Sequence, residues 1–84
     1  MGIKNLVKKD LPLEYRKIFS GEAVFEITAS STLACTIEFS LERNAAGMTN
    51  IRVYFKNSID YPLIPLMRAL KAHIRALDTE GRLP

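Results

Sequence analysis

The chain has 84 residues, of which 48% are hydrophobic and 25% are charged, and its formal net charge is +3. This length predicts a single domain over residues 1–84 with one hydrophobic core. A single cysteine and a single histidine exclude a disulfide framework and a zinc site built from the usual Cys and His ligands. No apolar run reaches the ~18 residues of a membrane span, so we expect no membrane contact and a cytoplasmic location.

The first segment, residues 3–19, is predicted to be helical in two pieces. Helical spacing joins Ile3, Leu6 and Val7, and it also joins Tyr15, Ile18 and Phe19. Pro12 is expected to separate the two pieces, because proline interrupts a helix. Ser20 and Gly21 are expected to end the second piece.

Three later segments alternate between apolar and polar residues, which is typical of half-buried strands. Their apolar members are Ala23, Phe25 and Ile27; then Leu33, Cys35, Ile37, Phe39 and Leu41; then Ile51, Val53 and Phe55. Turns are expected at ASST (29–32) and at RNAAGMT (43–49), where Gly47 can take a positive φ. Such short turns predict an antiparallel meander with residues 33–42 as its central strand.

The last segment, residues 58–84, predicts a C-terminal helix. Its apolar stripe is Leu66, Met67, Leu70, Ile74 and Leu77. Pro62 and Pro65 are expected before or within the first turn, and Gly81 just past the end. The predicted fold is α+β (α-β-β-β-α): a two-layer sandwich in which a three-stranded antiparallel meander is packed by the C-terminal helix, with an N-terminal helical segment.

This order of elements is shared with double-stranded RNA-binding domains. Those domains carry a lysine-rich Gly-Lys-Lys-type signature at the start of their last helix, where this chain has SIDYPLIPLM (58–67). A shared order of elements is an analogy and carries no function with it, so it assigns no family.

The uncharged stretch ITASSTLACTI, residues 27–37, raises the question of what covers it. The strand over residues 22–28 is expected at the edge of the sheet, where its backbone groups need a partner. We predict a homodimer in which two copies pair there through Val24, Glu26 and Thr28, to give a continuous six-stranded sheet. The alternative is that the N-terminal segment of the same chain covers this edge.

Two surfaces are candidates for binding. On the polar face of the sheet, Tyr54 with Arg52 and Lys56 could contact an unidentified protein partner, and a solvated face is the alternative. On the helix, the cations opposite the apolar stripe are candidate phosphate contacts, namely Arg68, Lys71 and Arg75. Basic residues of the N-terminal segment could join them and give a salt-dependent affinity for nucleic acid.

No motif predicts catalysis, a cofactor or a metal. The four glycines stand apart from one another, His73 is expected at the margin of the apolar stripe, and Cys35 is expected in the core. The sequence therefore predicts a small non-enzymatic, self-associating interaction or adaptor protein without catalytic, cofactor-binding or metal-binding residues. The alternative is a small nucleic-acid-binding protein that uses the basic N-terminal segment and the C-terminal helix face.

Overall fold

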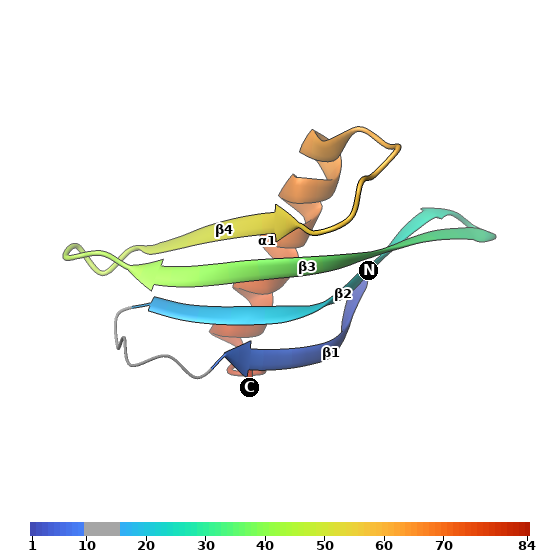
Figure 1. Ribbon diagram of the computed structural model, residues 1–84. Helices are drawn as coiled ribbons and strands as arrows, with labels where there is room; N and C mark the ends of the chain where they lie inside the picture. The colour runs from blue at the N-terminus through green and yellow to red at the C-terminus, as the bar shows by residue number, and fades with distance from the viewer. Residues whose placement is uncertain (10–15) are drawn as a thin grey trace.

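A computed structural model describes residues 1–9 and 16–84 (Figure 1). Its elements are β1 (Gly2–Lys9), β2 (Arg16–Thr28), β3 (Ser31–Arg43), β4 (Thr49–Phe55) and α1 (Leu63–Thr79). The strands form one antiparallel sheet in the order β1-β2-β3-β4, and α1 runs across one face of it. The fold is therefore α+β: a four-stranded antiparallel meander with one C-terminal helix.

The predicted N-terminal helix is wrong in the residues that the structure describes. Residues 2–9 form β1, and residues 16–19 begin β2. Ser20 and Gly21, which were expected to end a helix, lie inside β2. The predicted break at Pro12 falls outside the described residues. Without that helix, the order of elements found in double-stranded RNA-binding domains does not hold for this chain.

Burial of Phe19 explains why this region forms strand. Phe19 continues the two-residue alternation of Ala23 and Phe25 backwards through Gly21, and all three apolar side chains are buried in the core. Strand preference depends on packing against neighbouring strands more than on local propensity. The ring of Phe19 stacks on that of Phe39 in β3, with centroids 5.1 Å apart. This cross-strand pair outweighs the helical spacing of Ile18 and Phe19.

A β-bulge in β1 lies beside Gly21. The register shifts between Lys4 and Val7, and Asn5 in between has a φ of 53°. A Cβ added to Gly21 would lie 2.9 Å from Cγ2 of Ile3 and 3.1 Å from the carbonyl oxygen of Lys4. Glycine therefore lets β1 lie close against β2 at the bulge.

The three predicted strands are confirmed as β2, β3 and β4, with β3 between its two neighbours. β3 and β4 pair without any register shift. The turn that joins them is held by Asn44, whose Oδ1 accepts the backbone N–H groups of Ala46 and Met48, each at 3.0 Å. Gly47 has a φ of 80° there, as its place in the turn predicted.

The helix begins after Pro62 and has Pro65 in its first turn, as expected. At its other end Gly81 has a φ of 68°. The N–H of Gly81 donates to the carbonyl of Asp78, and the N–H of Arg82 donates to the carbonyl of Leu77. These two bonds form a Schellman motif, which satisfies the last carbonyl groups of the helix.

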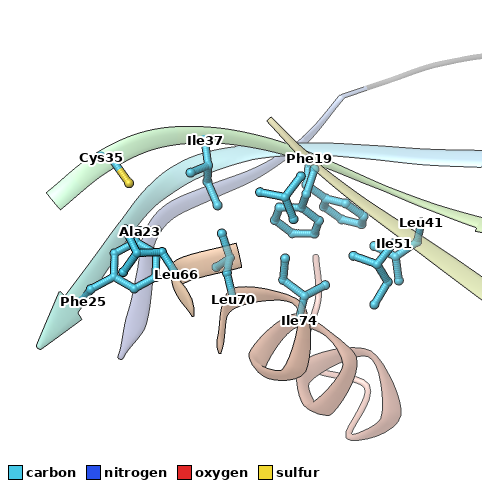
Figure 2. Packing of buried hydrophobic residues seen from close by; sticks show 12 residues of the cluster. Phe19, Ala23, Phe25, Cys35, Ile37, Leu41, Ile51, Leu66, Leu70 and Ile74 are labelled. Atoms are coloured by element: carbon cyan, nitrogen blue, oxygen red, sulfur yellow. The ribbon is translucent and has the colours of Figure 1, made fainter. Parts of the chain in front are cut away.

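The core lies between α1 and the sheet (Figure 2). Leu66, Leu70 and Ile74 of the predicted stripe are buried, whereas Met67 and Leu77 at its margins are half-buried. Against them lie the buried side chains of the strands: Phe19, Ala23, Phe25, Cys35, Ile37, Phe39, Leu41, Ile51 and Val53. The helix thus covers one face of the sheet, and the opposite face carries the alternate residues of each strand.

The hairpin of β2 and β3 extends beyond the rest of the sheet. β1 pairs with β2 only as far as Val24, and β4 pairs with β3 only as far as Ile37. Residues 25–35 therefore form a two-stranded ribbon, which projects from the sheet in Figure 1. Most of the uncharged stretch at 27–37 lies in this ribbon. The helix-side residues at its base, Phe25 and Cys35, are buried, and the turn at its tip is exposed.

Candidate functional site

The face of the sheet opposite α1, called the outer face below, is the surface that the described elements leave uncovered. At its centre Glu38 of β3 receives two lysines. Nζ of Lys9, from β1, lies 2.6 Å from Oε1 of Glu38, and Nζ of Lys56, just after β4, lies 3.0 Å from Oε2. One carboxylate thus joins charges from across the whole width of the sheet.

These contacts change the titration of Glu38. The hydrogen bond from Lys9, followed by that from Lys56, holds the pKa of Glu38 below its usual value, and desolvation opposes them more weakly. Glu38 is therefore a carboxylate at neutral pH, paired with two ammonium groups. A carboxylate in this state neutralises cations, and general acid catalysis would instead need a raised pKa.

Beside Glu38 the outer face has a shallow hollow of about 340 Å³. It is lined by Arg16, Ile18, Glu38, Phe39, Ser40, Tyr54 and Lys56. Ser40 is buried there, and Ile18 supplies an apolar side chain between the charged ones. The Nε of Arg16 is buried and finds no hydrogen-bond partner among the described residues. The hollow can therefore receive an apolar group together with a hydrogen-bond acceptor.

The residues predicted as a partner surface lie together on this face. Tyr54 and Lys56 line the hollow, and Tyr54 is 49% exposed. Arg52 is exposed on the same face of β4 and lines a neighbouring hollow near the turn at 44–48. An exposed tyrosine beside a cation is a combination that protein interfaces favour over ordinary surface.

The sequence reasoning missed Lys9, Arg16 and Ile18 as members of this surface. It assigned them to a helix, so it could not place them beside Glu38 and Tyr54. The alternation of Phe19 with Gly21 and the strand that follows was the available signal. The contribution of Lys9 depends on β1 pairing with β2, which no local pattern in residues 2–9 indicates.

The predicted dimer edge takes a different place. The strand with Val24, Glu26 and Thr28 is not an edge strand, because β1 pairs with β2 and places Gly2 opposite Val24. The alternative, cover by the N-terminal segment, is confirmed along this part of β2. Glu26 and Thr28 lie on the ribbon beyond the end of β1, and the N-terminal ammonium group is 3.8 Å from Glu26. The two edges of the sheet are β1 and β4.

The predicted phosphate contacts lie on α1, away from the outer face. Arg68 and Arg75 are exposed and Lys71 is half-buried. Lys71 and Arg75 line a shallow depression with Glu80 at its rim. Lys9 and Arg16 do not join them, because both lie on the other side of the sheet. The cations at the two ends of the chain therefore form two separate groups.

The remaining titratable side chains have structural places. Cys35 is buried, and burial, together with the nearby charge of Glu22, raises the pKa of its thiol. A buried thiol with a raised pKa is a poor nucleophile. His73 lies where the end of α1 meets β1, in a depression that Ile3, Leu6 and Leu77 also line. In residues 1–9 and 16–84, no three His, Cys, Asp or Glu side chains are placed to hold a metal ion.

The comparisons with known proteins identify a family. In the part of the chain that the structure describes, no helix is long and apolar enough to cross a membrane. No curated protein and no solved structure matches the chain. The model of one protein family matches residues 1–79, which is nearly the whole length. The chain belongs to that family, the BB-0187 family.

Proposed function

We propose that this chain is a small non-enzymatic interaction protein that binds another protein on the outer face of its sheet, around Tyr54. The observation that carries this proposal is the hollow beside Glu38, with a half-exposed aromatic ring at its rim. Tyrosines at such places contribute strongly to protein binding, because they bury a large apolar area and keep one polar group.

The charges of the outer face support an acidic partner segment. Among the described residues, four cations surround the hollow, namely Lys9, Arg16, Arg52 and Lys56, against the two carboxylates of Glu38 and Glu42. A carboxylate of the partner could accept hydrogen bonds from Arg16 and Lys56. An adjoining apolar side chain could then lie against Ile18 and Tyr54.

Photo-crosslinking tests the proposal. Tyr54 is replaced by the photoreactive residue benzoylphenylalanine, and the protein is irradiated in the cells that produce it. We expect a discrete protein adduct whose yield falls when Lys56→Ala is added. Replacing Tyr61, another exposed tyrosine in the loop before α1, gives the matched control. Equal adducts from both positions, or none from position 54, would contradict the proposal.

Nucleic-acid binding is the second candidate, and it uses a different surface. It is favoured by the placement of Arg68, Lys71 and Arg75 along one side of α1. This candidate predicts an affinity for oligonucleotides that falls steeply with salt and is weakened by Arg68→Ala with Arg75→Ala. Titration of mixed duplex and single-stranded oligonucleotides at low salt tests it. Tyr54→Ala should leave this affinity unchanged, which separates the two candidates.

A further inference from the structure

The two edges of the sheet differ in how they are protected. β1 carries the bulge at Asn5 and three lysines, which are features that discourage strand pairing. β4 has an unbroken register with β3 from Thr49 to Phe55 and carries one cation, Arg52. β4 is therefore the edge that is better suited to accept another strand.

The alternation of backbone hydrogen bonds identifies which groups of β4 face outward. The N–H of Lys56 donates to the carbonyl of Thr36 across the sheet. In an antiparallel pair, residues that point toward the neighbouring strand alternate with residues that point away from it. Tyr54 and Arg52 therefore point their backbone groups toward β3. Ile51, Val53 and Phe55 present theirs at the open edge.

We propose that a second copy of this chain pairs with that edge, β4 against β4, about a two-fold axis at Val53. In this register each Val53 exchanges two backbone hydrogen bonds with its counterpart, and Ile51 pairs with Phe55 of the other copy. The joined strands give one eight-stranded antiparallel sheet with isologous contacts. This proposal is independent of protein binding at the outer face, which stays open in the dimer.

Side-chain pairing selects this register. On the outer face it places Arg52 opposite Tyr54 of the other copy, where a guanidinium group can stack on the ring. A register centred on Arg52 would instead place two guanidinium groups directly opposite each other, which destabilises a strand pair. A register centred on Ile51 would leave Phe55 beyond the joined strands.

Apolar side chains on α1 extend the surface available for the contact. The helix begins near β4 and ends near β1, where Leu77 and His73 lie beside Ile3. Its beginning carries exposed apolar residues: Leu63 at 45% and Ile64 at 69% exposure. A two-fold axis perpendicular to the sheet places both helices on the same face. Both helix beginnings then lie toward the joint, and they add to the small area that a strand edge buries by itself.

Light scattering on a sizing column tests the dimer. We expect wild-type protein to approach twice the 9.5 kDa chain mass as its concentration rises. Val53→Pro removes the outward N–H group from both copies at once and should weaken the dimer by at least about tenfold. Val53→Ala is the matched control, because it also shortens a core side chain but keeps the N–H group. Monomers of wild-type protein at every concentration, or equal weakening by both variants, would overturn the proposal.

Disulfide trapping reports the register without relying on the proline variant. In a Cys35→Ala background, proteins carrying Arg52→Cys and Tyr54→Cys are mixed and oxidised. We expect an intermolecular disulfide in the mixture, joining position 52 of one chain to position 54 of the other. Each protein oxidised alone should form much less. A disulfide that forms efficiently with Arg52→Cys alone would place the two-fold axis at position 52 and overturn the register.

Discussion

At the scale of single residues, Gly21 has the closest contacts. The bulge of β1 packs directly over it, so any side chain there meets Ile3 and the backbone of Lys4. We expect Gly21→Ala to lower the free energy of unfolding by about 1–3 kcal/mol, because β1 must shift to make room. Denaturant unfolding measures this change. Gly2→Ala is the control, since nothing lies within 4 Å of a Cβ at that position, and a similar loss in both variants would contradict the explanation.

Glu38 should make stability depend on pH in the acid range. Its pKa is lower in the folded chain than its usual value of about 4.3, because Lys9 and Lys56 donate hydrogen bonds to it. The resulting stabilisation is present above the usual pKa and is lost as pH falls through the lower, folded value. We expect Glu38→Gln to destabilise the protein at pH 7 by no more than about 1 kcal/mol, because the lysines are partly solvated.

Unfolding curves of both proteins between pH 2 and pH 7, at roughly one-unit steps, measure that difference. It should stay constant above about pH 5 and vanish in stronger acid. Glu26→Gln serves as the control, because the side chain of Glu26 is 77% exposed and its ion pair with the N-terminus is long, at 3.8 Å. A difference at Glu38 that persists unchanged to the lowest pH would mean that its charge does not cause it.

Part of the candidate site could be predicted at this scale. Tyr54, Arg52 and Lys56 share a face because alternate residues of one strand always do. That Lys9 and Lys56 both reach Glu38 could not be predicted, because the two lysines lie 47 positions apart in the sequence, counting from 9 to 56. Their meeting depends on strand order and register, which are properties of the sheet.

At the scale of elements, α1 depends on its packing more than on its own helix propensity. It buries Leu66, Leu70 and Ile74 against the sheet, and Leu70 is fully buried. We expect Leu70→Ala to cost about 2–5 kcal/mol, which is most of the stability of a domain this small. Circular dichroism during thermal unfolding, at one low protein concentration, measures this loss. Leu63→Ala removes the same group from an exposed place and should change stability by about 0.5 kcal/mol or less.

The elements were predictable where a pattern was long and had one period. β3 and α1 each keep a single period along their whole length, so their type and their core residues follow from the sequence. The failure came in residues 2–9 and 16–19. In β1 the bulge at Asn5 breaks the alternation. At the start of β2, the apolar neighbours Ile18 and Phe19 fit a helical period as well as a strand. A short segment with both readings is decided by its neighbours in space.

At the scale of the whole molecule, the projecting ribbon at residues 25–35 should be the least protected part of the central hairpin. Neither β1 nor β4 pairs with it among the described residues. We expect amides at 32–34 to exchange with solvent at least about tenfold faster than those at 38–40, which lie between two paired strands. Hydrogen exchange followed by NMR compares them. Equal protection would contradict this expectation and show that another chain covers the ribbon.

The sequence by itself determined that this is a one-domain α+β protein with a meander, a C-terminal helix and their shared core. Local periodicity carries that information, because burial of one face requires apolar residues at a fixed spacing. Only the tertiary structure decided that residues 2–9 form a fourth strand, that β4 and not β2 is an open edge, and that Lys9 lies beside Glu38. These features come from pairing between distant segments. The energy of such pairing depends on register and burial across the whole sheet, and no short stretch of sequence records it.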